Sequence, residues 1–361
     1  MNLTEVETIL LVTNQGRAVF LIVNDSTHFL MIQRLLTLSQ ILLLIVLVSG
    51  LTTAQDKQPS GSRTEKVFPA ADHHQHLFSA AYVARSSGVN PISAQDLINL
   101  LDKAGIERAV VLSTAFSYGR PEREPSNEYE AVKAENDWTA AQAALFPKRL
   151  IAFCSFNPLK EYALDELDRC SKDSHLRRGI KMHFGNSDVQ LEIPEHFEKL
   201  KKVFQAANKE RMAIVVHMKA SISKKRPYGP EQARLFLELL SFAPDIPVQI
   251  AHMASSGPGF VDPPAHSVIE VLADAVAKKD SRTRKLWFDV ASNAHPENPA
   301  ETSELLVKLI RQIGVKRILY GTDGAAGNNL RPRESWEAFR GLKLTQKEIK
   351  TIAENVAPYF R

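Results

Sequence analysis

The stretch Asp72-His73-His74-Gln75-His76 decides the fold of this chain, because it combines a strand-like setting with two histidines separated by one residue. If residues 67–78 form a strand, the alternation of side chains places Asp72, His74 and His76 on one face. Two imidazoles at this spacing are able to share one metal cation. Such a pair is also common at the polar end of a strand, so the metal hypothesis requires further ligands elsewhere.

Three later segments share one pattern, an apolar run that leads to a histidine or an aspartate. These runs end at His217, His252 and Asp323. Each run is typical of a buried parallel strand whose polar residue lies at the carboxyl end. Since the carboxyl ends of parallel strands in a barrel meet at one mouth, we expect these side chains and the first histidine pair to surround one metal site.

Strand-like and helix-like stretches alternate from residue 67 to the end of the chain. We expect strands near residues 67–77, 108–115, 149–157, 178–184, 212–219, 247–253, 285–291 and 317–322. Eight such units predict an α/β fold, a (β/α)8 TIM-type barrel with a metal site at its C-terminal mouth. One domain over 67–361 is sufficient, because 44% hydrophobic residues fill a large single core.

These residues resemble the amidohydrolase superfamily, and more closely its amidohydrolase-2 branch, which includes enzymes like aminocarboxymuconate-semialdehyde decarboxylase. The resemblance is carried by the D-x-H-x-H opening, the two single histidines after apolar runs, the end Tyr320-Gly321-Thr322-Asp323 and the closing segment 351–360. It implies a metal-dependent hydrolase that attacks a small amide, ester or lactone with metal-bound hydroxide. Non-oxidative decarboxylation of a small aromatic or unsaturated carboxylic acid is the alternative on this scaffold, and an inactive metal-binding exported barrel is a third hypothesis.

The resemblance also implies roles for the individual residues. His74, His76 and His217 are expected to bind one divalent ion per chain, preferably Zn²⁺, with Asp323 across the mouth. Asp323 is expected to contact the metal and to accept a proton from the bound water. His252 is expected to be catalytic without binding metal, orienting the nucleophile or donating a hydrogen bond to the carbonyl oxygen under attack.

Lys181 and His183 alternate along the fourth expected strand and share a face. Some amidohydrolases carry a carboxylated lysine on this strand, so a second metal ion is expected only if Lys181 is carboxylated. Otherwise Lys181 is a fixed positive charge suited to a carboxylate or phenolate substrate. His183 either lines the pocket or binds the backbone. Asp72 is expected to support the ligands from outside the metal shell, and His73 to point away from it.

The amino end has the composition of a targeting segment. From Met31 a basic start, an apolar centre and small residues up to Ala54 predict a signal peptide over 31–54, and hence export to the periplasm or the medium. An uncleaved membrane anchor over 35–55 is the alternative. Residues 1–30 are interpreted as a mis-assigned upstream stretch, and 55–66 as a flexible leader.

Other features of the sequence limit the classes of molecule that the protein is expected to bind. The formal net charge is +4 and the basic residues are scattered, which argues against nucleic-acid binding and leaves a small-molecule substrate, with a homo-oligomer left open. Arg120 and Arg123, in a charged insertion after the second expected strand, are candidates for gripping a carboxylate. Cys154 and Cys170 either pair or remain buried thiols.

Overall fold

The computed structural model describes residues 7–12, 18–23, 67–86, 88–121, 125–219 and 227–360. The chain divides into two compact units, Met1–Glu65 and Lys66–Arg361. In the first unit, β1 (Glu7–Val12) pairs antiparallel with β2 (Ala18–Val23).

The expected signal peptide, leader and membrane anchor, which span residues 31–66, lie outside the described residues, as does Arg123. Among the residues that are described, no helix is both long and apolar enough to cross a bilayer.

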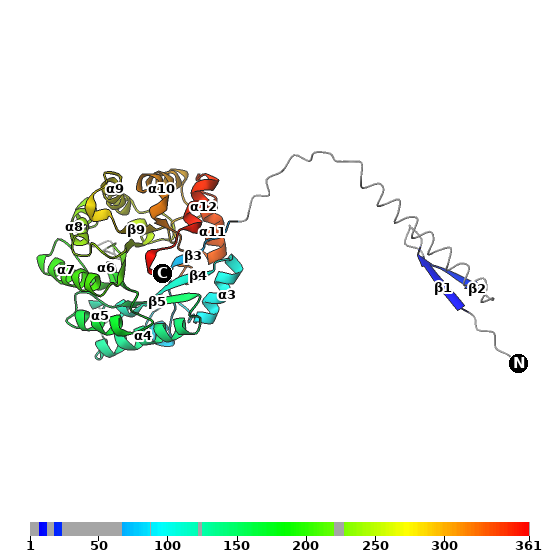
Figure 1. The fold of residues 1–361 in the computed structure, drawn as a ribbon, viewed down its shortest axis with the longest axis horizontal. Coiled ribbons are helices and arrows are strands. Elements are labelled where there is room, and N and C mark those ends of the chain that lie inside the picture. The colour runs from blue at the N-terminus through cyan, green and yellow to red at the C-terminus, as the bar shows by residue number, and fades with distance from the viewer. Residues whose placement is uncertain are drawn as a thin grey trace. The chain divides into compact units, whose positions relative to one another are not determined.

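The second unit is a parallel barrel with helices around it (Figure 1). Its eight strands follow the order β10-β9-β8-β7-β6-β5-β4-β3. They are β3 (Ala71–Gln75), β4 (Arg108–Leu112), β5 (Leu150–Ser155), β6 (Gly179–His183), β7 (Ala213–His217), β8 (Val248–Ile250), β9 (Leu286–Asp289) and β10 (Ile318–Leu319). The predicted (β/α)8 fold is confirmed, and each predicted strand position contains a strand.

Most of the long helices around the barrel bury an apolar face, and two of them begin with a polar cap that is exposed to solvent. Ser93 and Asp96 form a capping box at the start of α3, and Thr345 and Glu348 form another at α12. The longer α-helices are α3 (Ala94–Ala104), α4 (Glu128–Ala144), α5 (Ala163–Lys172), α7 (Pro194–Lys209), α8 (Pro230–Leu240), α9 (Pro263–Ala277), α10 (Ala300–Ile313), α11 (Pro332–Arg340) and α12 (Gln346–Glu354). The short elements are α2 (Ala80–Val83), η1 (Ala115–Ser117), α6 (Phe184–Ser187), η3 (Ala251–Ala254), η4 (Ser281–Thr283), η5 (Val315–Arg317) and η6 (Pro358–Phe360).

The core has two layers, one between strands and helices and one inside the barrel. On β7, Ile214 and Val216 belong to the outer layer, whereas Ala213 and Val215 belong to the inner cluster. Because side chains alternate along a strand, His217 is the next inward residue and reaches the mouth. The inner cluster also contains Tyr359, from the end of the chain.

The first and last strands close the barrel through Asp72. Its carboxylate accepts hydrogen bonds from the backbone N of Thr322 (3.1 Å), the Oγ1 of Thr322 (2.6 Å), the Nε2 of Gln75 (2.7 Å) and the backbone N of His74 (3.0 Å). The neighbouring Gly321 allows close approach, because a Cβ there would lie 3.0 Å from the Cβ of His74. Asp72 therefore supports the first histidine pair by fixing the backbone that carries it.

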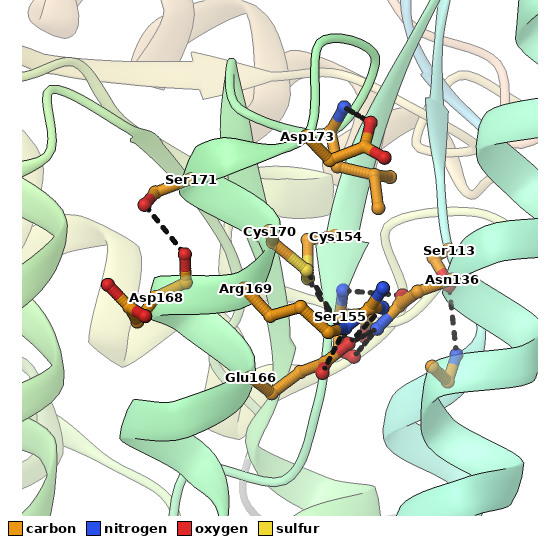
Figure 2. The surroundings of a disulfide bond; sticks show 12 residues. Ser113, Asn136, Cys154, Ser155, Glu166, Asp168, Arg169, Cys170, Ser171 and Asp173 are labelled. Carbon is orange, nitrogen blue, oxygen red and sulfur yellow. Dashed lines mark hydrogen bonds and ion pairs between the residues drawn. A yellow bond between two sulfur atoms is a disulfide. The ribbon is translucent and has the colours of Figure 1, made fainter.

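A disulfide joins the barrel to its helical layer. Cys154 on β5 bonds Cys170 on α5, with their Cα atoms 6.2 Å apart (Figure 2). The buried carboxylate of Glu166 lies beside the sulfurs and accepts hydrogen bonds from Asn136 and Arg169. Of the two alternatives that the sequence left open for these cysteines, the structure has the pair.

Replacing Asp72 with Ala should destabilise the barrel strongly, because four buried donors lose their acceptor. We expect a loss of about 3 kcal/mol or more in the free energy of unfolding, measured by urea denaturation. Asp168→Ala is the matched control, because it removes an exposed ion pair with Lys172 and should cost less than about 0.5 kcal/mol. Equal midpoints for the two variants would contradict the role of Asp72.

Candidate metal centre

The polar side chains of the barrel mouth all follow from the parallel strand direction. His183, His217 and Asp289 end β6, β7 and β9, respectively. His74 lies within β3, and the remaining candidates lie within a few residues of a strand end: His76, His252 and Asp323. Carboxyl ends of parallel strands share one end of the barrel, so these groups converge there.

His74 is held by a carboxylate. Its Nδ1 lies 3.0 Å from Oδ2 of Asp289, and both side chains are buried. A carboxylate oxygen accepts, so Nδ1 carries the hydrogen and donates it. The Nε2 of His74 consequently presents its lone pair toward the mouth, as in a metal ligand oriented by an acidic partner.

His76 and His252 are oriented in the same way by backbone carbonyls. The Nδ1 of His76 lies 2.6 Å from the oxygen of Leu112, and the Nδ1 of His252 lies 2.9 Å from the oxygen of Ala291. A carbonyl only accepts, so each ring donates from Nδ1 and leaves the lone pair of Nε2 free. His252 therefore offers an acceptor at Nε2, which suits the first of its two expected roles, orientation of the nucleophile, better than donation of a hydrogen bond.

Asp323 contributes an oxygen without a protein partner. Its Oδ2 accepts a hydrogen bond from Asn329 at 3.0 Å, but its Oδ1 is buried and has no hydrogen-bond partner among the described residues. That Oδ1 lies 3.9 Å from Nε2 of His76. Burial raises the pKa of Asp323, against the opposing effect of Lys181. A bound cation would satisfy this oxygen and stabilise its charge.

Three potential ligands of the mouth, His74, His252 and Asp323, have donor atoms that lie within 4.8 Å of one another. The ring of His76 is 5.4 Å from that of His74. His217 lies further out, with its ring 5.2 Å from that of His252 and its Nε2 3.4 Å from Oγ of Ser256. Imidazole lone pairs around an unpartnered carboxylate oxygen fit a divalent cation.

Burial keeps the mouth histidines neutral. It lowers the pKa of His76 to about 3 and the pKa of His73 to about 4. The pKa is also lowered, first by burial, in His74, His183, His217 and His252. The contact between His76 and Asp323 is therefore not an ion pair at neutral pH.

Lys181 is the cation of the mouth. It is 1% exposed, and its Nζ lies 3.3 Å from Nε2 of His74. Burial lowers the pKa of Lys181, although Asp289 and Asp323 act in the opposite direction. The amine therefore loses its proton more easily than an exposed lysine does.

His183 is bound to the backbone, which was one of the two expected alternatives. Its Nδ1 accepts a hydrogen bond from the N of Asn186 at 3.2 Å. Its ring also stacks on His217 with centroids 3.9 Å apart, so it packs against a candidate ligand.

The strand alternation used for the first histidines does not hold throughout β3. Its register with β4 shifts between Asp72 and Gln75. His73 still lies away from the metal group, since its Nδ1 donates to the oxygen of Tyr320 at 2.8 Å. It accepts a hydrogen bond at Nε2 from the N of Ala357 at 3.2 Å.

The expected strand over residues 247–253 includes His252, but in the structure His252 lies beyond the end of that strand. The strand ends at Ile250, and His252 and Met253 adopt left-handed backbone conformations with φ of 53° and 50°. Such conformations are uncommon for residues other than glycine and carry no clear sequence signal. The turn aims the imidazole into the mouth.

Asp289 is a site residue that the sequence analysis missed. Its Oδ2 accepts from His74 and from the Nε2 of Gln249 (2.6 Å), and its Oδ1 accepts from the backbone N of His252 (2.9 Å) and of Ala291 (3.1 Å). The signal was available, because Asp289 also ends an apolar strand.

Fold and site together define a TIM-barrel enzyme with a histidine and carboxylate centre at the C-terminal mouth. The model of the amidohydrolase family, Amidohydro_2, matches residues 71–356. The chain belongs to the amidohydrolase family, and the resemblance seen in its sequence is thereby confirmed. A comparison with curated proteins finds no match.

Solved structures share the fold. A 2,6-dihydroxybenzoate decarboxylase complexed with 2,6-dihydroxybenzoate aligns with a TM-score of 0.57 and 16% identity, covering 80% of this chain and 97% of its own. A dihydroxybenzoic acid decarboxylase from Polaromonas sp. JS666, with bound manganese and 2-nitroresorcinol, gives 0.54 and 16%, covering 80% and 95%. An amidohydrolase from Burkholderia multivorans with bound zinc gives 0.51 and 10%, covering 79% and 95%. Hydrolases and decarboxylases thus occur on this scaffold.

The metal-free protein should lose stability as the pH falls below about 6.5. The unfolded chain protonates its histidines near that pH. In the folded protein the pKa is about 4 for His73 and about 3 for His76, and burial also lowers the pKa of the other histidines of the mouth. The unfolded state therefore binds more protons in this window. Asp323 and Asp72 have a raised pKa, so these two groups bind more protons in the folded state and oppose the loss of stability, but they are fewer than the histidines. The free energy of unfolding, measured by urea denaturation, should be lower at pH 5 than at pH 7.5 by about 2 kcal/mol or more. A flat profile would contradict buried neutral histidines.

Proposed function

We propose that the protein is a metal-dependent hydrolase that cleaves a small amide, ester or lactone at the barrel mouth. One observation carries this proposal: His74, His76 and His252 direct Nε2 lone pairs toward the mouth, where the Oδ1 of Asp323 is buried and has no partner in the part of the chain that the structure describes. We assign His74, His76, His217 and Asp323 as ligands of one divalent ion. Zinc is preferred because the donor set is rich in imidazole.

A bound divalent cation supplies Lewis acidity, which polarises a carbonyl group and acidifies water. Asp323, whose pKa is raised by burial, is suited to take the proton of the attacking water near neutral pH. His252 has an acceptor lone pair at Nε2 and can orient that water. The amino group of Lys181 is suited to donate a hydrogen bond to the substrate oxygen on which negative charge develops.

A pocket of about 430 Å³ beside this centre is a suitable substrate site. It adjoins the centre through Ser256, which contacts His217. Its wall includes Tyr228, Val261 and prolines, and its Lys219 forms an ion pair with Asp262. Because this lysine is already neutralised, the pocket favours a neutral, largely apolar acyl compound over an acid.

Decarboxylation of a small carboxylic acid is the second candidate, and Lys181 is the observation in its favour. A buried cation beside His74 is well suited to receive a substrate carboxylate. If Lys181 is carboxylated instead, a second metal ion would be expected, and intact-mass measurement would find the additional carboxyl group.

The ligand assignment predicts different outcomes for the two remaining histidines. Wild-type protein should hold about one zinc per chain, and the double variant His74→Ala/His76→Ala should lose it. His217→Asn should also lose metal, whereas His252→Asn should keep metal and lose turnover. Elemental analysis of each purified variant measures this. If His252→Asn loses metal and His217→Asn keeps it, His252 is the ligand and His217 is not. The position of His252 close to His74 and Asp323 would agree with that result.

A screen with lactones, esters, amides and aromatic carboxylic acids, combined with CO₂ detection, tests the reaction. Asp323→Asn should lower turnover of the substrate found by about two to four orders of magnitude, because the proton acceptor is removed. CO₂ release from an aromatic acid with no hydrolysis would select the second candidate. Near-normal turnover in Asp323→Asn with a full complement of metal would exclude Asp323 as the base.

We also propose that the protein is exported after cleavage following Ala54. The Cys154–Cys170 disulfide supports this, because disulfides persist mainly in oxidising compartments. Intact-mass measurement of protein made in a secreting host should give a chain that starts at Gln55. A mature product that retains residues 35–48 and remains with membranes would instead indicate an anchor.

A further inference from the structure

The end of the chain enters the barrel from the side opposite the metal centre. Arg178, which precedes β6, donates from Nη1 to the backbone oxygen of Tyr359 at 3.1 Å. Arg108, the first residue of β4, lies over the ring of Phe360 at 5.2 Å. Both contacts are at the amino ends of strands. Figure 1 accordingly has the C-terminus in the middle of the ring of helices.

A continuous line of hydrogen bonds connects this end of the barrel with the mouth. The hydroxyl of Tyr359 donates to Oε1 of Gln249 at 2.5 Å. The Nε2 of Gln249 donates to Oδ2 of Asp289 at 2.6 Å, and the same oxygen accepts Nδ1 of His74 at 3.0 Å. All four side chains are buried.

Each bond in this line fixes the orientation of the next group. The hydroxyl of Tyr359 engages the amide oxygen of Gln249, so the amide nitrogen faces Asp289 and the backbone oxygen of His73, 3.1 Å away. If the amide turned over, its oxygen would face the carboxylate of Asp289 and the two acceptors would repel each other. The carboxylate in turn holds the hydrogen of His74 on Nδ1.

We propose that Tyr359 is a positioning residue that keeps the metal-facing nitrogen of His74 available through Gln249 and Asp289. This inference rests on the metal site proposed above. It gives the end of the chain a role in the site at the opposite end of the barrel. Partners outside the ligand shell commonly influence metal affinity in this way, because they fix the tautomer and orientation of a ligand.

Zinc affinity tests this proposal without any substrate. Metal-free full-length protein is titrated with zinc against a chromophoric chelator. Tyr359→Phe removes only the hydroxyl and should weaken zinc binding by about tenfold, the lower end of effects seen for such outer partners. Gln249→Met should weaken it similarly. The double variant should be no weaker than either single variant, because both changes break the same line.

Tyr320→Phe is the matched control. Tyr320 is also buried, and its hydroxyl contacts the oxygen of Pro332 at 3.5 Å, outside this line. It should keep wild-type zinc affinity, and thermal unfolding of the metal-free variants shows whether each is folded. Wild-type affinity in Tyr359→Phe, or additive losses in the double variant, would overturn the proposal.

A second readout separates this inference from the proposed function. In metal-free protein, ¹⁵N signals of the His74 ring should show the hydrogen on Nδ1, and Tyr359→Phe should give a mixture of both tautomers. If wild-type protein binds no zinc, the metal assignment fails, and the ring signals alone decide the role of Tyr359. Unchanged His74 signals in Tyr359→Phe would then reject it.

Discussion

The site depends on how the carboxylate of Asp289 is shared. One of its oxygens holds the backbone of His252 and Ala291, and the other holds the imidazole of His74 and the amide of Gln249. An unpaired carboxylate with no exposed surface would be very costly, so these four donors stabilise its charge together. They also tie three strand ends, β3, β8 and β9, to one point. Removal of this carboxylate would release the His252 turn and the His74 ring at once, which explains why the mouth has a defined geometry although its residues are far apart in the chain.

A second buried carboxylate, that of Asp72, closes the barrel in a similar way. Asp72 joins the first strand to the segment after the last, and the backbone N of Asp323 donates to the oxygen of His74 at 2.8 Å. Asp323 itself has a φ of 51°, a conformation that non-glycine residues adopt at some cost. The closure offsets this cost, because the flanking backbone is held by Asp72 and by Asn329. The contacts that close the barrel therefore also position the candidate metal ligands His74 and Asp323.

The sequence was sufficient for the features that follow from periodicity. The alternation of strand-like and helix-like stretches predicted eight strands. The apolar runs that end in His217, His252 and Asp323 predicted a common mouth, because parallel strands must place their carboxyl ends together. It was insufficient where local backbone geometry departs from that period. The register of β3 with β4 shifts between Asp72 and Gln75, and the left-handed turn at His252 lies beyond the strand. The position of Asp289 at the end of an apolar strand was a usable signal for the mouth, but its contact with His74, 215 positions away, has no local pattern. The role of Tyr359 likewise arises from a contact with Gln249, 110 positions away.

Lys181 gives the site its remaining constraint. Its ammonium and a metal cation compete for one lone pair, since the Nζ lies 3.3 Å from the Nε2 of His74. An exposed lysine would hold its proton firmly and disfavour the cation. Burial lowers the pKa of Lys181, so the proton is lost more readily when a second positive charge approaches. Metal binding at the proposed site is then linked to proton release, as is usual where ligands and their neighbours must be deprotonated. The surrounding histidines need to release no proton, because each is neutral and keeps its lone pair at the pH where an exposed imidazole would begin to take up a proton.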